Sequence, residues 1–176
     1  MLRREIHVSV SGAGAHVTTF PASRTLDAVD EVRGAYYRLV LLVGPEGVGK
    51  TTALQGIATE LGWPIFRVGE CMAEVLLDRA VRSRAVAAPG ILGDLLRATD
   101  AAGVCLDNIE LLFEISLALD PLRLLQGLAR DRTIIAAWPG TFVGNVLGYA
   151  ADGHPEARRY SRPEAAIITD PRKGVQ

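Results

Sequence analysis

The residues best suited to chemistry are a lysine and a threonine at the end of a glycine-rich loop. Residues 44–51, Gly-Pro-Glu-Gly-Val-Gly-Lys-Thr, fit the phosphate-loop pattern G-x-x-x-x-G-K-[ST] without a mismatch. The glycines let the backbone curl so that successive N–H groups face inward and cradle phosphate oxygens. Lys50 adds a mobile positive charge for the β- and γ-phosphates, and the Thr51 hydroxyl can bind magnesium.

The elements around this loop are those that such a site needs. The apolar run Leu39–Val43 predicts a buried strand before the loop, and a helical pattern follows from residue 50 to about residue 61. The positive end of that helix dipole adds to the attraction for phosphate. A glycine-rich turn that binds nothing is the alternative, and this context disfavours it. The residues expected to contact a nucleotide are Gly44, Pro45, Glu46, Gly47, Val48, Gly49, Lys50, Thr51 and Thr52.

A second acidic centre follows a later apolar strand. The run 103–106 leads into Asp107, the arrangement called a Walker B motif. An aspartate there can hold magnesium through water or through Thr51, opposite the phosphates. Asp107 can also be read as an ordinary helix N-cap. With a phosphate loop upstream the metal role is favoured, so Thr51 and Asp107 are the predicted magnesium residues.

The residues after Asp107 leave the catalytic step open. Many ATPases have a glutamate directly after this aspartate, where it polarises the attacking water, but here Asn108 takes that position. Asn108 can orient a water molecule but cannot accept its proton. Glu110 can accept it, or it can bond back to the backbone in a capping box. Both unaided slow hydrolysis and pure nucleotide sensing are therefore compatible with the sequence.

An arginine pair before the last predicted strand is a further candidate. Arg158 or Arg159 can reach a neighbouring copy's site and stabilise charge in the transition state. The plainer alternative is a solvated pair, or a salt bridge to Glu156 or Glu164. Thr141 is the nearest polar residue after the fourth predicted strand and only a weak candidate for contact with the γ-phosphate.

Composition sets outer limits on the function. A chain of 176 residues with net charge −1 is typical of one globular domain, and its total charge does not indicate a nucleic-acid partner. Cys71 and Cys105 form no C-x-x-C motif, and Cys105 is expected to be a buried core residue. The N-terminal sequence contains no long apolar run, so we expect neither a signal peptide nor a membrane span, and a reduced cytoplasm is the default compartment.

The periodicity predicts alternating strands and helices. We expect an N-terminal extension over residues 1–20, either a strand or an ordered tail, a nucleotide-binding domain over 21–170, and a polar tail over 171–176. Within the domain, strands are predicted at 63–68, 133–137 and 165–169, and helices at 21–34, 70–85, 91–99, 109–119 and 121–130. A break is expected at 88–90, and residues 141–164 are rich in glycine, polar residues and arginine, with no element assigned.

This order of elements predicts an α/β, three-layer P-loop NTPase fold, with a mainly parallel five-stranded sheet and helices on both faces. Ligands of such sheets bind beyond the carboxyl ends of the strands, where Gly44 and Asp107 both lie.

Several segments together resemble the BrxF family, small P-loop proteins encoded with bacterial BREX (bacteriophage exclusion) defence systems. The segments are Leu106-Asp-Asn-Ile-Glu-Leu-Leu-Phe113, Asp120-Pro-Leu-Arg-Leu-Leu-Gln-Gly127, Ile135-Ala-Ala-Trp-Pro-Gly140, Tyr149-Ala and Gly153-His-Pro-Glu156. The resemblance covers roughly residues 36–170 and implies a reduced AAA-type ATPase without a C-terminal helical lid domain. It implies ATP and magnesium as ligands, bound by Gly44, Gly49, Lys50, Thr51 and Asp107. It also implies other BREX-system proteins as partners.

Three functions therefore compete. The first is an ATPase or nucleotide-driven switch that acts through protein partners. A homo-oligomeric ring is one form in which it could act. The second is a small-molecule kinase, whose only available lids would be residues 82–90 and 141–164. The third is a nucleotide-dependent DNA-binding module, for which Arg158, Arg159, Arg162, Arg172 and Lys173 give a mild positive bias.

Overall fold

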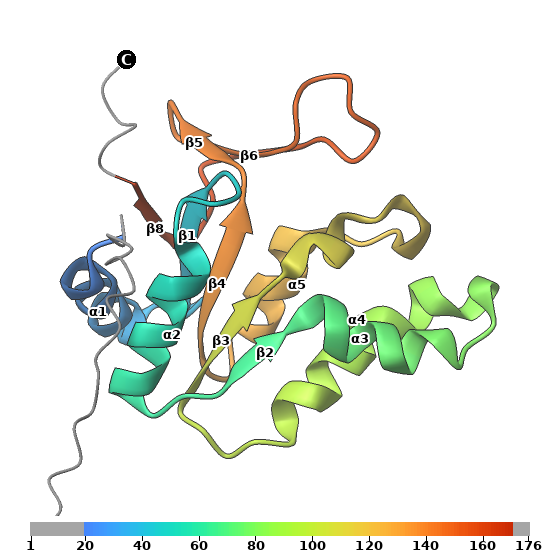
Figure 1. Cartoon of the computed structure of the whole chain (residues 1–176), viewed down its shortest axis with the longest axis horizontal. Coiled ribbons are helices and arrows are strands. Elements are labelled where there is room, and N and C mark those ends of the chain that lie inside the picture. The colour runs from blue at the N-terminus through green and yellow to red at the C-terminus, as the bar shows by residue number, and fades with distance from the viewer. Residues whose placement is uncertain (1–19, 171–176) are drawn as a thin grey trace, which may run out of the picture.

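The computed structural model describes residues 20–170, which form a five-stranded sheet with helices on both faces and a separate three-stranded sheet (Figure 1). The expected extension and tail fall on residues 1–19 and 171–176, outside the described residues. Phe20, the first described residue, is buried against the helices of one face.

The larger sheet has the strand order β2-β3-β4-β1-β8, and all its neighbouring strands are parallel. Its strands are β1 (Leu39–Gly44), β2 (Ile65–Arg67), β3 (Gly103–Asp107), β4 (Thr133–Pro139) and β8 (Ala166–Thr169). The predicted fold class is thereby confirmed. β4 separates β1 from β3, so the carboxyl ends of β1 and β3 lie one strand apart at the same edge.

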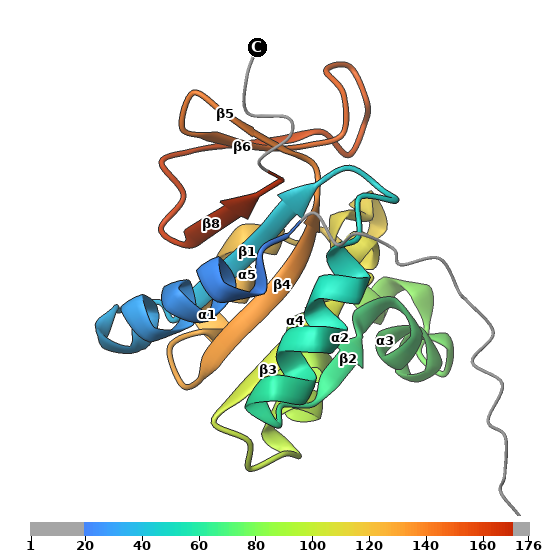
Figure 2. The same ribbon diagram turned by 60° about the vertical axis from the view of Figure 1, so that its left-hand side comes forward.

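Helices bury both faces of this sheet. Leu39 and Leu41 of β1 pack into one core cluster, and Val40 and Leu42 pack into the other. The helices α1 (Ala22–Glu31) and α2 (Lys50–Leu61) cover the second cluster, whereas α3 (Val68–Leu77), α4 (Val81–Arg97) and α5 (Pro121–Leu128) cover the first (Figure 2). A strand buried on both faces needs an unbroken apolar sequence, which explains the run before the phosphate loop.

Local signals fix the ends of two helices as predicted. Gly62 adopts φ 67°, a left-handed conformation that ends α2. Asp120 caps α5, because its side chain accepts a hydrogen bond from the Arg123 N–H at 3.0 Å, and Pro121 is the first helical residue.

The predicted helix boundaries between residues 70 and 99 were wrong. α3 ends at Leu77 rather than near residue 85, and α4 then runs unbroken through Pro89 to Arg97. Proline removes one helical hydrogen bond and disfavours the preceding turn. Burial of Ala88, Leu92 and other apolar residues of α4 against the core outweighs this cost.

The single helix predicted for residues 109–119 is also absent. Two short 3₁₀ segments take its place, η2 (Ile109–Phe113) and η3 (Ile115–Leu117), with Glu114 extended between them at ψ 126°. The tighter winding buries Ile109 and Leu112, three residues apart, on one side of the segment.

Residues 141–164, for which no strand was predicted, contain the whole of the second sheet. Its strands β5 (Thr141–Val143), β6 (Val146–Tyr149) and β7 (Arg158–Ser161) are antiparallel. Gly144 and Asn145 connect β5 to β6 with φ values of 57° and 63°. A two-residue Gly-Asn loop between apolar residues is a hairpin signal that the prediction overlooked.

The second sheet is fixed over the carboxyl edge of the first (Figure 1). The Trp138 indole Nε1 of β4 donates to the Gly148 carbonyl of β6 at 3.0 Å, and the Gly140 N–H donates to the Gly44 carbonyl at 3.2 Å. A Cβ atom on Gly140 would lie 1.9 Å from the Gly148 carbonyl oxygen. Only glycine at this position allows the two sheets to approach so closely.

We therefore expect Gly140→Ala to destabilise the fold by about 1–3 kcal/mol or more, since the added methyl group overpacks rigid backbone. Gly56→Ala, in an exposed turn of α2 with open space around it, is the matched control and should stabilise by up to about 1 kcal/mol. Urea unfolding measures both. Equal stabilities of the Gly140→Ala variant and the wild type would contradict the close approach of the Gly140 backbone to the Gly148 carbonyl.

Candidate functional site

The phosphate loop has the backbone geometry that its glycines predict. Gly47 and Gly49 have φ values of 73° and 91°, in the left-handed region that other residues avoid. A Cβ atom on Gly44 would lie 2.9 Å from Cγ2 of Val48, so the loop closes tightly on its first residue. The loop thus curls around its own centre and delivers the chain to the first turn of α2 at Lys50.

The Lys50 ammonium lies against this loop. The residue is only 9% exposed, and its Nζ donates to the carbonyl oxygens of Gly44 at 2.7 Å and Pro45 at 2.6 Å. Burial lowers the pKa of Lys50, while the carboxylates of Glu110, Asp107 and Glu46 oppose that shift. The ammonium group is therefore folded back onto the loop, within electrostatic reach of three carboxylates.

Asp107 ends β3 and contacts the start of α2. Its Oδ1 accepts a hydrogen bond from the Thr51 hydroxyl at 3.2 Å, although 56 residues separate the two in sequence. The reading of Asp107 as an N-cap does not hold, because Asn108 precedes η2 and no side chain caps that segment. Asp107 is buried and directed at the phosphate loop rather than at the helix that was predicted to follow it.

A hydroxyl and a carboxylate in contact fit magnesium. Magnesium keeps several waters and binds through one or two protein oxygens together with substrate phosphates. Among residues 20–170 no group of three or more His, Cys, Asp or Glu side chains could hold a metal on its own. Thr51 and Asp107 therefore suit a metal that is bound jointly with a triphosphate.

The remaining residues predicted for the nucleotide lie around the loop. Pro45, Glu46 and Thr52 are exposed, and Val48 is half-buried beside Gly44. Val43, Gly44 and Pro45 line a cavity of about 200 Å³, together with Thr141 and residues at the end of β8. Thr141, the weak candidate for a γ-phosphate contact, lies in that cavity at the start of β5.

Asn108 and Glu110 differ in their relation to the loop. Asn108 is exposed in a left-handed conformation, φ 50°, and its carbonyl accepts the Gly69 N–H at 3.0 Å. Glu110 is exposed in the first turn of η2 and makes no side-chain capping bond there. The predicted capping box is therefore absent. Glu110 instead acts electrostatically on Lys50, as a carboxylate at the rim of the site does.

The two arginines lie on β7. Arg159 forms an ion pair with Asp152 at 2.6 Å and also donates to the carbonyls of Tyr149 and Ala150. The expected salt-bridge partners, Glu156 and Glu164, were therefore wrong for Arg159, whose guanidinium holds its own β6–β7 connection. Arg158 is half-buried and donates to the adjacent Ala157 carbonyl at 3.0 Å.

Sequence reasoning missed an aromatic cluster beside the site. Phe113 of η2 stacks on Tyr149 of β6 with ring centroids 3.6 Å apart, and it meets Trp138 edge-on at 5.0 Å. Tyr160 of β7 meets Trp138 edge-on, with ring centroids 5.9 Å apart. These rings come from segments far apart in sequence, and the unpredicted second sheet contributes two of the four, Tyr149 and Tyr160.

A second cavity, of about 290 Å³, lies next to Asp107 on the side away from β4. Arg67 at the end of β2, Gln55 of α2 and Cys71 of α3 are among its lining residues. Arg67 is the parallel-strand neighbour of Asp107, so both side chains leave the same edge of the sheet.

The other cysteine, Cys105, is fully buried in β3 as predicted, and burial raises the pKa of its thiol to about 12.

A parallel sheet with a phosphate loop after β1 and a buried aspartate at the end of β3 defines the P-loop NTPase class. Within that class, part of the chain is similar to AAA-type ATPases. Residues 40–89 match the family model described as AAA, ATPase family associated with various cellular activities, and this match supports a nucleotide-binding P-loop ATPase. The search of curated proteins found no match. No helix in the described part of the chain has the length and apolarity to cross a membrane.

Burial of the Lys50 ammonium predicts a specific pH dependence of stability. Because the folded-state pKa lies below the unfolded value near 10.5, burial of the charged form opposes folding fully at neutral pH. That penalty disappears as the pH rises through the lowered pKa towards 10.5. Lys50→Met removes the charge, so the stability of the variant relative to wild type should fall as the pH increases from 7 to 10. Chemical denaturation across this range measures the difference, and a constant difference would contradict the burial penalty.

Proposed function

We propose that this chain binds ATP with magnesium at the phosphate loop and hydrolyses it, as an accessory ATPase or switch of a BREX phage-defence system. The observation that carries the proposal is the contact between the Thr51 hydroxyl and Asp107, with Lys50 lying beneath the loop. A glycine-rich turn without function has no need of a buried carboxylate and a buried ammonium at the same edge of a sheet.

Each residue has a role that its position supports. The loop amides and the start of α2 bind the phosphates, and Lys50 leaves the Gly44 and Pro45 carbonyls to reach the β- and γ-phosphates. Thr51 and Asp107 hold magnesium, which neutralises charge on the phosphates when bound. Asn108 orients the attacking water, and Glu110 at the rim accepts its proton.

The role in defence rests on the segments that resemble the BrxF family. Three of them meet in space, because Phe113 contacts both Trp138 and Tyr149, and each of these residues belongs to a different segment. Other BREX-system proteins are the proposed partners, acting on a single chain or a homo-oligomer. Arg158 is the better candidate for an arginine that reaches the nucleotide site of a neighbouring copy, since Arg159 is paired with Asp152.

A small-molecule kinase is the second candidate, and the cavity beside Asp107 favours it. Arg67 lines that cavity next to the magnesium position, where an acceptor substrate would have to lie. The two functions differ in one requirement. An ATPase releases phosphate without any acceptor, whereas a kinase forms ADP only when an acceptor is supplied.

Lys50→Ala should weaken ATP binding by about 100-fold or more, because it removes a charge-assisted contact to two phosphates from a buried position. Thr59→Ala, exposed on the far turn of α2, is the matched control and should bind as wild type does. Titration calorimetry with ATP and magnesium gives both affinities. Unchanged affinity in the Lys50→Ala variant would rule out the phosphate loop as the binding site.

Glu110→Gln should leave ATP affinity within about threefold of wild type and lower turnover by about 100-fold, since an amide cannot accept the proton of water. Glu114→Gln, just beyond η2 and exposed, serves as the control. Phosphate release under saturating ATP is the measurement. If the Glu110→Gln variant turns over normally, Glu110 is not the base.

A further inference from the structure

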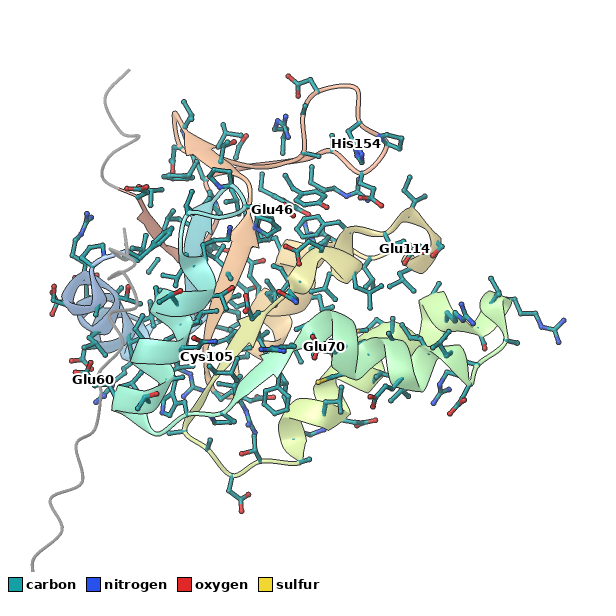
Figure 3. All side chains as sticks on the ribbon, in the orientation of Figure 1. Glu46, Glu60, Glu70, Cys105, Glu114 and His154 are labelled. Atoms are coloured by element: carbon teal, nitrogen blue, oxygen red, sulfur yellow. The ribbon has the colours of Figure 1, made fainter. Side chains whose placement is uncertain are left out.

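A polar cavity of about 440 Å³ lies at the amino end of β1, away from the phosphate loop. The segment before β1 and the turn between α5 and β4 form it, and three arginines line it: Arg33, Arg38 and Arg130. Figure 3 shows Glu46, on the phosphate loop, at the upper end of the larger sheet, and Figure 2 shows the turn between α5 and β4 at the lower end. A strand of six residues spans roughly 20 Å, so the cavity is separate from the nucleotide site.

Hydrogen bonds join the two segments that form this cavity. The Arg38 N–H donates to the Ala129 carbonyl at 2.9 Å, and the Ile134 N–H of β4 donates to the Arg38 carbonyl at 2.8 Å. The Arg38 guanidinium also donates to the Arg130 carbonyl at 2.6 Å. Because a guanidinium has more N–H donors than this one bond uses, Arg38 can bind a ligand without leaving its place. The cavity is therefore preformed.

The lining of the cavity is positively charged. Among the described residues that line it, the only carboxylate is that of Asp131, which stands against three guanidinium groups. Arg33 pairs with Asp30 at 3.0 Å, but the two side chains are 70% and 69% exposed, and ion pairs so exposed are weak. Guanidinium groups bind phosphate oxygens in a bidentate manner. The cavity therefore fits a ligand that carries phosphate groups.

An exposed aromatic ring at the cavity indicates the kind of phosphate ligand. Tyr36 lines the cavity and is 66% exposed, although a large aromatic side chain contributes to folding mainly when it is buried. The guanidinium carbon of Arg130 lies 4.9 Å from the centroid of this ring, and Tyr37 meets the ring edge-on at 4.8 Å. Two neighbours thus hold the ring while most of the residue stays accessible. Exposed rings beside positive side chains bind single-stranded nucleic acid, because a base stacks on the ring while the cations bind the backbone.

We propose that this cavity binds a single-stranded nucleic acid, with a base stacked on Tyr36 and the phosphates bound by the three arginines. An acidic protein segment would pair with the arginines but would leave the ring unused, and a double helix keeps the faces of its bases stacked inside. None of the lining arginines is among those that the sequence indicated for DNA binding. The proposal is independent of the proposed ATPase function, because the two sites lie at opposite ends of β1.

Substitutions of Tyr36 test the stacking contact. The ligand is a fluorescently labelled oligothymidylate of about ten nucleotides, and its affinity is measured by fluorescence anisotropy at low salt without ATP. Tyr36→Leu should weaken binding by about tenfold because it removes the ring, whereas Tyr36→Phe keeps the ring and should bind within about twofold of wild type. Equal affinities of these two variants would overturn the stacking of a base on Tyr36.

Substitutions of arginine test the position of the site. Arg130→Ala should weaken binding by about fivefold or more, since it removes a phosphate contact and the cation over the ring. Arg82→Ala, exposed in the first turn of α4, makes the same change in charge elsewhere and should bind as wild type does. An equal loss in both variants, or no binding by the wild type at low salt, would overturn the site.

Two further measurements complete the test. Raising the salt concentration should weaken wild-type binding, because bound phosphates release counterions. Oligoglutamate should compete poorly with the oligothymidylate, and competition as strong as that of unlabelled oligothymidylate would overturn nucleic acid as the ligand in favour of an acidic protein segment. Tyr36 and Arg130 are exposed, so the variants should melt at the wild-type temperature, which assigns a loss of affinity to the site.

Discussion

The contact between Thr51 and Asp107 depends on the parallel register of β1, β4 and β3. Each of these strands is buried on both faces, so its register is fixed by two cores at once. Parallel pairing brings the carboxyl ends of β1 and β3 to one edge, where the hydroxyl of α2 meets the carboxylate at 3.2 Å. The phosphate loop, Lys50 and η2 are then arranged around this pair.

The electrostatics of this edge follow from a single ammonium among several carboxylates. Lys50 is buried and within electrostatic reach of Glu46, Asp107 and Glu110. A bare triphosphate entering such a rim would meet more negative than positive charge, and burial strengthens that repulsion. A divalent cation bound with the nucleotide reverses the balance at Asp107. These charges therefore favour the proposed metal–nucleotide complex over free ATP as the ligand.

The sequence was informative where local chemistry decides the structure. The phosphate loop and the five parallel strands follow from glycine spacing and unbroken apolar runs, and the α5 cap follows from Asp120. It was misleading where tertiary burial decides. Pro89 was taken as a helix break, yet the core holds α4 together around it. The position of Tyr149 beside Phe113 was beyond sequence reasoning, because it depends on two sheets approaching at Gly140.

The most direct test of this account is the affinity of the wild-type chain for ATP with and without magnesium, beside Asp107→Asn. We expect magnesium to strengthen wild-type binding by about tenfold or more, and to have little effect on the variant, whose amide is a weaker magnesium ligand than the carboxylate. Failure of the wild type to bind millimolar ATP in the presence of magnesium would contradict the account, as would an equal magnesium effect in the Asp107→Asn variant.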